Sequence, residues 1–488
     1  MPDRLVFVNY KNPVQQVRDQ ELRRTVASHI GKHYRNRSKP LQRQTSHTEQ
    51  HSPHNFCFAI ANPVSDDQAS PRASSLRLFK GNSDPFESHV VKVDPYISGV
   101  IAFYRDVAAP AMSNTSPRGW TFWQSTALGR RDSSDTLRGP CTAFGFLARA
   151  ALMASKLTPS LLPRALALLG QSMCSLTRAL ETGHDFHYPT NYKQILVLFS
   201  TETLSGNQNA AAVHGTILGA VFEAQKQSGN IDYAMLHYAL WMDAHFSAIF
   251  LVPTLFNAEH WCSEELGSLD ARPEPLLDKL SDVSVESLHN SITDPSIRGV
   301  LLVSRGVIEL WQQYYSGEIA PSERGFLWLF YRVLICQQQI IEIYLSAVRG
   351  GSVHGVFEQC ILLATLIWVR KLIFQLNIGG FGFYDAIPSI LIELEASLKL
   401  AQEKEPQGWE KSPHALFWVL FSAAQVEQDP RRFHRQQSSW LTQGLITQAQ
   451  ALDLLTWEPT IEILRMFVFS DLVEPHGAKW FPPFVEHM

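Results

Sequence analysis

Residues 160–182 read SLLPRALALLGQSMCSLTRALET. The large apolar residues of this stretch recur at intervals of three and four, so an α-helix carries them all on one face. They are Leu162, Leu166, Leu169, Met173, Leu176 and Leu180. Pro163 lies in the first turn, where its missing N–H removes no intrahelical hydrogen bond. The stretch therefore predicts an amphipathic helix with one buried face.

The same spacing recurs through most of the remaining chain, which indicates an all-α fold. Further helices are expected at residues 97–109, 141–156, 191–203, 209–227, 231–250, 299–315, 324–347, 353–375, 384–404, 413–426, 438–455 and 459–470. Period-2 alternation bounded by hairpin turns is nearly absent, and no fixed repeat of about 30–45 residues is evident. We expect an irregular multi-helix array, with a loop between two helical layers in the Pro- and Asp-rich stretch 264–296.

The N-terminal part differs from this helical body in charge and composition. Residues 1–43 hold ten basic and three acidic residues, a net charge of +7 in a chain whose formal net charge is −4. Residues 44–95 are rich in Ser, Pro, Gln and His and offer little to bury, which is typical of disorder. We therefore expect a disordered basic arm (1–43), a disordered linker (44–95) and a helical domain (96–488).

The composition is that of a globular protein. Hydrophobic residues make up 45% of the chain, charged residues 18%, and the mean hydropathy is −0.09. The start, MPDRLVFVNYKNP, lacks the apolar core of a secretory leader. The longest apolar run, residues 361–376, has Arg370 and Lys371 at its centre, which favours a buried helix over a membrane span. We expect a soluble, intracellular protein that does not bind membranes.

The six cysteines are widely spaced. They are Cys57, Cys141, Cys174, Cys262, Cys336 and Cys360. A structural zinc site needs ligands in tight local pairs, and no C-x2-C pair is present. The sequence therefore argues against a zinc finger or binuclear zinc cluster, and no metal site is predicted. Isolated cysteines in an intracellular protein are typical small core residues.

One acidic residue interrupts an otherwise apolar helix, at Asp243 within ALWMDAHFSAIFL. A buried carboxylate needs a partner, because burial without one is costly. It could act as a general base or effector contact, and an enzyme would pair it with His245 or His237. The alternative, which we favour, is a structural group bonded to a neighbouring helix end or to an arginine.

Other motifs give no catalytic signature. His29 and His33 are spaced for one helical face, as a metal pair would be, but no third ligand lies near them in sequence. His184 and His187 lack the spacing of a facial iron triad. The Gly-rich stretch 378–385, IGGFGFYD, has neither a preceding strand nor the lysine of a phosphate-binding loop. No nucleophile elbow, H-E-x-x-H or kinase set is present. We predict no catalytic residue, no cofactor and no enzyme activity.

Five stretches of the chain resemble the fungal-specific transcription factor domain. The first is FVNYKNP (7–13) with SHIGKHYRNR (28–37), which is similar to the opening of family members without a zinc cluster. The others are SDPFESHVVKVDPYISGVIAFYRDVAAPAM (83–112), LHYALWMDAHFSAIFLVPTLF (236–256), PHALFWVLFSAAQV (413–426) and GLITQAQALDLLTWEP (444–459). Residues 236–256 are similar to that domain's Trp-x-Asp segment before an Ala- and Pro-containing turn. The order and spacing of the stretches carry the resemblance.

The resemblance implies a nuclear transcriptional regulator or co-regulator whose helical domain is regulatory, in a family often tied to secondary-metabolite gene clusters. Family members that bind DNA do so through the cysteine cluster that this chain lacks. We therefore expect only weak, sequence-independent DNA contact, or nuclear import, through basic residues of the arm. These are Arg23, Arg24, Lys32, Arg35, Arg37, Lys39 and Arg43. A protein partner or homodimer is also expected. The rival hypotheses are a non-catalytic helical interaction scaffold and an uncharacterised enzyme.

Overall fold

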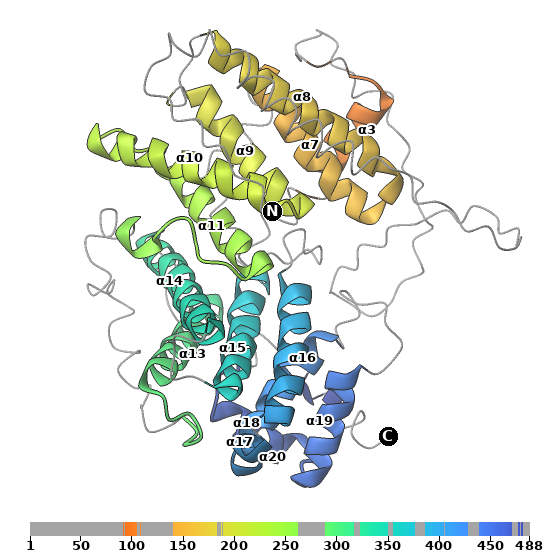
Figure 1. Ribbon diagram of the computed structural model, residues 1–488, viewed down its shortest axis with the longest axis vertical. Coiled ribbons are helices and arrows are strands. Elements are labelled where there is room, and N and C mark those ends of the chain that lie inside the picture. The colour runs from red at the N-terminus through yellow and green to blue at the C-terminus, as the bar shows by residue number, and fades with distance from the viewer. Residues whose placement is uncertain are drawn as a thin grey trace, which may run out of the picture. The chain divides into compact units, whose positions relative to one another are not determined.

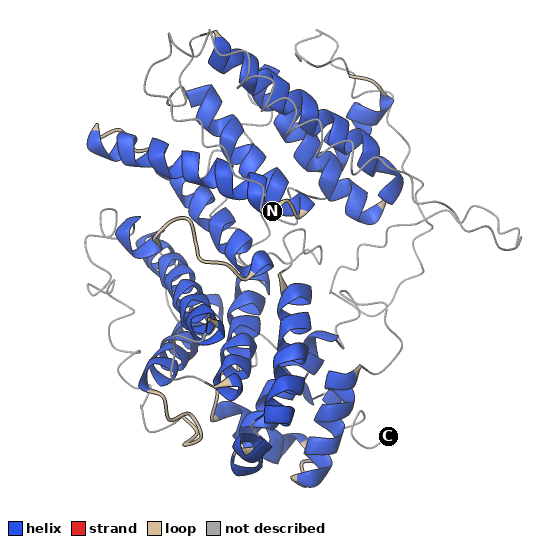
Figure 2. Cartoon of the chain, viewed as in Figure 1, coloured by secondary structure: helices blue, strands red, loops and turns tan. Residues whose placement is uncertain are grey.

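The computed structural model describes most of the helical body. The described residues are 91, 93–104, 108, 140–182, 187, 189–261, 288–316, 323–349, 355–375, 386–404, 406–427, 439–470, 477–478 and 480–481. They form fourteen α-helices, one short 3-10 helix and no strand, so the all-α prediction is confirmed (Figure 2). Residues 1–77 and 78–488 are separate units, and every described residue belongs to the second. The predicted arm, and the linker as far as residue 90, lie outside the described residues.

The first group of helices packs around α7 (Figure 1). It comprises α3 (Pro95–Phe103), α7 (Pro140–Leu157), the 3-10 turn η2 (Pro159–Leu161), α8 (Leu162–Glu181), α9 (Pro189–Ser205) and α10 (Gln208–Gln227). Helix α7 contacts α3, α8 and α9, and α10 packs on α9. Gln194 of α9 joins α8, because its Nε2 donates to the carbonyl of Ser172 at 2.6 Å and to its Oγ at 3.0 Å.

The second group packs around α15 (Figure 1). It comprises α13 (Pro295–Ser316), α14 (Glu323–Val348), α15 (Val356–Gln375), α16 (Ile387–Lys404), α17 (Pro406–Lys411), α18 (Pro413–Glu427), α19 (Trp440–Ala451) and α20 (Trp457–Arg465). Helix α15 contacts α13, α14, α16 and α18, and every residue from 361 to 371 is buried. The expectation that the apolar run around Arg370 and Lys371 forms a buried helix is confirmed for these residues.

Helix α11 (Tyr233–Phe250) lies between the two groups (Figure 1). It contacts α9 and α10 of the first group and α14 and α16 of the second. All residues from 235 to 248 are buried, so this helix has no solvent-facing side over that length. A helix without a polar, solvent-facing side is typically covered by other elements on all sides. Its polar residues therefore have to be satisfied inside the protein.

Side-chain caps fix where several helices begin. Asp94 accepts the backbone N–H of Ile97 at the start of α3, and Asp232 accepts that of Met235 at the start of α11. Ser439 does the same for the first turn of α19. Such caps satisfy N–H groups that have no partner within the helix.

The buried face of α8 differs from the predicted one. Leu169 and Leu176 are buried as expected, but Leu162 is 43% exposed. The other buried positions are Ala165, Leu168 and Ser172. The small residues of this face allow α7 to approach closely, since a Cβ atom at Gly145 would lie 3.0 Å from Ser172 Oγ. The helix is thus rotated to bring its small residues, rather than only its largest ones, against its neighbour.

The helices of the C-terminal part differ from the predicted ones in length and number. The helix expected at 459–470 is α20, which ends at Arg465, and residues 466–470 are not helical. Carbonyls of this segment serve other elements, because Met466 O accepts from His289 N and Val468 O accepts from Trp418 Nε1. Helix α17 was not predicted. The loop expected at 264–296 is seen at residues 288–294, and its part up to 287 lies outside the described residues.

Candidate functional site

The carboxylate of Asp243 is buried and bonded to the turn that follows its own helix. The side chain is 2% exposed, and its two oxygens accept the N–H groups of Leu255 and Phe256, each at 2.9 Å. Leu251 ends α11 with a left-handed φ of 49°, and the chain then folds back toward the carboxylate. Asp243 therefore stabilises the turn at 251–256. This is a structural role, as favoured from the sequence, but its partners are backbone N–H groups of the turn and not a helix end or an arginine.

Burial raises the pKa of Asp243 to about 7, although the two backbone hydrogen bonds act in the opposite direction. A raised carboxyl pKa is also common in catalytic acids and bases. Here the same oxygens are occupied by backbone donors, which accounts for the polar group without a catalytic role.

The two histidines of α11 contact groups other than the Asp243 carboxylate. His245 Nδ1 lies 2.8 Å from the carbonyl of Trp241, one helical turn earlier. Burial and the nearby Arg370 guanidinium hold the pKa of His245 well below its usual value. His237 packs edge-on against Tyr331, with ring centroids 5.6 Å apart. Positions 243 and 245 point to opposite sides of a helix, so their side chains do not converge on one site.

Buried cations and glutamines connect α11 with the second group. Arg370 Nη1 donates to Gln337 Oε1 at 3.0 Å, and Gln337 Nε2 donates to the carbonyl of Ala244 at 2.6 Å. Lys371 Nζ donates to Gln425 Oε1 at 3.1 Å, which joins α15 to α18. A glutamine can accept from a cation and donate to a carbonyl through one amide. The two charges singled out in the sequence are thus part of the packing of the core, and their glutamine partners were not predicted.

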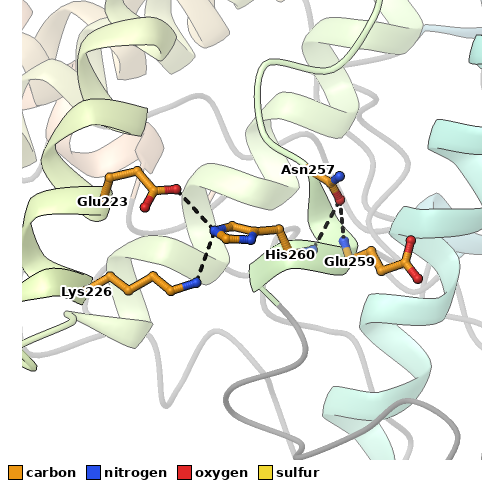
Figure 3. Close-up of polar contacts among 5 residues, drawn as sticks. All are labelled: Glu223, Lys226, Asn257, Glu259 and His260. Carbon is orange, nitrogen blue, oxygen red and sulfur yellow. Dashed lines mark hydrogen bonds and ion pairs between the residues drawn. The ribbon is translucent and has the colours of Figure 1, made fainter.

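An exposed cluster joins the end of α10 to the helical turn at 258–261 (Figure 3). His260 Nε2 lies 3.0 Å from Lys226 Nζ and 3.2 Å from Glu223 Oε1. His260 Nε2 accepts from Lys226 when this nitrogen carries no proton and donates to Glu223 when it carries one, so the two hydrogen bonds alternate. Asn257 Oδ1 caps the turn, and the Glu259 side chain points away (Figure 3). Exposed pairs of this kind add little stability.

A second histidine contact lies in the second group. His289 Nε2 is 3.3 Å from His414 Nδ1, and the His289 ring stacks on Phe467 with centroids 5.1 Å apart. Ser291 approaches the other nitrogen of His289, with its Oγ at 2.7 Å and its backbone N at 3.2 Å. No sequence motif predicted this pair, because its members are 125 positions apart.

Protonation of the partly buried His214 is expected to reduce stability as the pH falls from 7 to 5, which is opposite in sign to the contribution of Asp243 over the same range. Burial lowers the pKa of His214 to about 4, whereas an unfolded histidine takes up its proton below about 6.5. The folded state thus binds fewer protons in this range, and this contribution to stability is lost as the pH falls through it, by about 1–2 kcal/mol for one such group. In urea unfolding, lowering the pH from 7 to 5 should therefore raise the stability of His214→Gln relative to the wild type by about 1–2 kcal/mol. An identical pH dependence in the two proteins would contradict this assignment.

The structure describes only some of the other residues singled out in the sequence. Every basic residue proposed to contact nucleic acid lies in the arm and therefore outside the described residues. His29, His33, His184 and residues 378–385 also lie outside the described residues, whereas His187 is described and exposed. Cys336 and Cys360 are buried as expected, whereas Cys174 is exposed, contrary to expectation. Cys57, Cys262 and the side chain of Cys141 lie outside the described part.

The described residues show neither a metal centre nor a membrane-spanning helix. The described residues hold no group of three or more His, Cys, Asp or Glu side chains placed to bind a metal ion. None of the described helices has both the length and the hydropathy needed to cross a membrane. Comparison of the chain with protein-family models, curated proteins and solved structures gave no match.

Proposed function

We propose that this chain is a transcriptional regulator or co-regulator of the fungal type, in which the helical body is a regulatory module. The basic arm supplies nuclear import and weak, sequence-independent contact with DNA. The body acts through a protein partner or a second copy. This proposal rests on the resemblance of five stretches to the fungal-specific transcription factor domain.

The position of those stretches in the fold is the observation that supports the proposal best. Residues 236–256 cover most of α11 and the turn after it, and Asp243 binds the backbone of that turn. Residues 413–426 make up almost all of α18, where every side chain from 417 to 426 is buried. A sequence pattern that coincides with the central packing elements is one that specifies a fold. The resemblance in these two stretches therefore concerns the architecture of the regulatory domain.

The chemistry of the buried polar groups is consistent with a body that does not catalyse. The one acidic candidate, Asp243, is bonded to backbone N–H groups, and the buried cations Arg370 and Lys371 donate to glutamines. Asp243 thus holds the turn after its own helix, and the two cations join neighbouring helices. The proposal for this body is accordingly regulation through packing surfaces, with no reaction step.

The proposal is tested by following gene expression and location together. Transcripts are profiled after deletion and after overexpression of the full chain, and a tagged copy is localised. A regulator changes one coherent set of genes in opposite directions in the two strains and resides in the nucleus. Strictly cytoplasmic localisation, or an unchanged transcript profile in both strains, would overturn it. Strains in which metabolites change before transcripts would indicate an enzyme instead.

The arm makes a separate prediction about DNA affinity. Changing Arg35, Arg37, Lys39 and Arg43 to Gln is expected to weaken binding to an arbitrary duplex at least tenfold in 50 mM NaCl. Each phosphate contact releases counterions, so loss of four contacts reduces the slope of log affinity against log salt by up to about 3.6. Fluorescence anisotropy at 50 and 200 mM NaCl measures both quantities.

A matched variant controls for the loss of four positive charges. Lys156, Arg178, Lys404 and Lys411 are exposed on the helical body, and changing these four to Gln removes the same charge elsewhere. This control is expected to bind like the wild type. If both variants lose affinity equally, the effect comes from net charge and the arm has no special role.

A further inference from the structure

Three segments of the second group meet at His289. This residue belongs to the loop before α13, its partner His414 lies in the first turn of α18, and Phe467 belongs to the segment after α20. The His289 backbone N–H donates to Met466 O at 2.9 Å, and its ring stacks on Phe467. Phe467 stacks in turn on Trp418, with centroids 5.1 Å apart. The backbone and side chain of His289 thus hold the loop at 288–294 to two other segments.

The hydrogen-bond donors around His289 determine where its proton lies. The backbone N–H of Ser291 can only donate, and it points at His289 Nδ1 at 3.2 Å. Ser291 Oγ lies 2.7 Å from the same nitrogen, and its hydroxyl can turn to donate as well. With Nδ1 as the acceptor, the proton of the neutral ring lies on Nε2. Nε2–H then donates to His414 Nδ1 at 3.3 Å, so this nitrogen accepts as well. In this arrangement both imidazoles are neutral.

We propose that the His289–His414 contact is a pH-sensitive device, which holds the loop at 288–294 to α18 while both rings are neutral and releases it on mild acidification. This inference is independent of the proposed role in transcription, and it can be tested on the purified protein.

Protonation of His414 Nδ1 removes a hydrogen bond, because the new proton meets the Nε2–H of His289. Protonation of His289 Nδ1 sets that nitrogen against the backbone N–H of Ser291 and leaves the Ser291 hydroxyl, at 2.7 Å, as its acceptor. The first turn of α18 also carries the positive end of a helix dipole, which disfavours an imidazolium ion. Consistent with this geometry, burial and the neighbouring His414 lower the pKa of His289.

Charged groups on the surrounding elements also lie near this contact. Arg298 of α13 donates to the carbonyls of Leu288 and Ile292, so a cation already lies against this loop. The Asp294 carboxylate caps α13 by accepting the N–H groups of Ser296 and Ile297. Among the described residues, the other charged side chains of α13, α17, α18 and α20 are Arg305, Glu309, Glu410, Lys411, Glu427, Glu458, Glu462 and Arg465.

A divalent metal is the main alternative for two facing imidazole nitrogens. Two nitrogens bound to one tetrahedral zinc are separated by roughly 3.4 Å, which is close to the separation seen here. A metal at Nε2 of His289 would require the proton on Nδ1, where the backbone N–H of Ser291 opposes it although the Ser291 hydroxyl could accept it. Among the described residues no third His, Cys, Asp or Glu completes a metal site with this pair, so the hydrogen-bonded pair is the better explanation, and metal binding is one outcome of the test.

The first experiment needs no substitution. The full chain is labelled with 15N at histidine, and long-range 1H–15N spectra at pH 7.5 report which ring nitrogen carries each proton. Both His289 and His414 are expected to be neutral with the proton on Nε2. Amide exchange of residues 288–294 is then measured at pH 7.5 and 5.5, relative to the intrinsic rate of each amide. Protection is expected to fall about tenfold at the lower pH, because one partly buried hydrogen bond is lost.

Variants separate this contact from general acid sensitivity. In His414→Asn the side-chain oxygen can accept from His289 Nε2–H but does not titrate, so the loss of protection should become smaller. His187→Gln, which changes an exposed histidine in the first group, should behave like the wild type. Equal protection at both pH values would overturn the proposal, as would a proton on His289 Nδ1. Protection that rises with zinc and falls with a chelator would show a metal site instead.

Discussion

Replacing Asp243 with Leu is expected to lower the free energy of unfolding by about 2–5 kcal/mol. The substitution leaves the N–H groups of Leu255 and Phe256 without their acceptor, and each unsatisfied buried donor costs about 1–3 kcal/mol. Asp243→Asn keeps one oxygen acceptor but turns an amide N–H₂ toward the second donor, so a smaller loss is expected. Urea unfolding of the full chain measures both differences.

The neighbouring Glu259 provides a matched control. It is an exposed carboxylate in the same connection, so Glu259→Gln should change the free energy of unfolding by less than about 0.5 kcal/mol. If Asp243→Asn instead abolished an activity and left stability unchanged, the structural assignment of this carboxylate would be wrong.

The effect of Asp243→Asn should also depend on pH. The carboxyl pKa is about 7 in the folded protein and about 3.9 in an unfolded chain. Between these values the folded state binds more protons, so this group's contribution to stability decreases as the pH rises from 4 to 7. The asparagine has no such dependence. The difference in unfolding free energy between wild type and variant should therefore be larger at pH 5 than at pH 8.

Truncating Trp418 is expected to be at least as damaging, with a loss of about 3–5 kcal/mol for Trp418→Ala. The ring is completely buried, stacks on Phe467 and donates from Nε1 to Val468 O at 2.9 Å. Trp418→Phe keeps most of the apolar contact but leaves that carbonyl without this donor, so a loss of about 1–3 kcal/mol is expected. Amide exchange of residues 466–470 should become faster in both variants.

A second tryptophan distinguishes the hydrogen bond from ring size. Trp440 is only partly buried and lies against Lys399 at 5.2 Å, so Trp440→Phe should alter stability much less than Trp418→Phe. Equal effects of the two phenylalanine substitutions would show that the Nε1–Val468 hydrogen bond contributes little.

Most helices could be predicted from the sequence, because their apolar residues recur at the spacing of an α-helix. The helix expected at 209–227 is observed at 208–227, and the one expected at 384–404 begins three residues later than predicted. The rotation of α8 could not be predicted, because it depends on how closely Ser172 lets α7 approach. Residues 466–470 continue the helical pattern, but their carbonyls are used by residues from other elements.

The candidate site was only partly predictable for a related reason. Sequence alone identifies Asp243, Arg370 and Lys371 as polar groups in apolar surroundings, which must have partners. It does not name those partners, since Gln337 and Gln425 are ordinary residues that become special only through the packing of α14 and α18 against α15. The His289–His414 contact joins a loop to a distant helix, and no spacing rule covers such a pair.

The position of α11 has a consequence for how the body unfolds. The long connection after it, which includes the Pro- and Asp-rich stretch, has the composition of a boundary between domains. Both groups of helices nevertheless bury this one helix, so neither can detach without exposing its apolar surface to water. We therefore expect this stretch not to divide the body into two parts that unfold independently. A cut there would expose apolar surface of α11 and of the helices that cover it, so the two groups are expected to unfold in one transition.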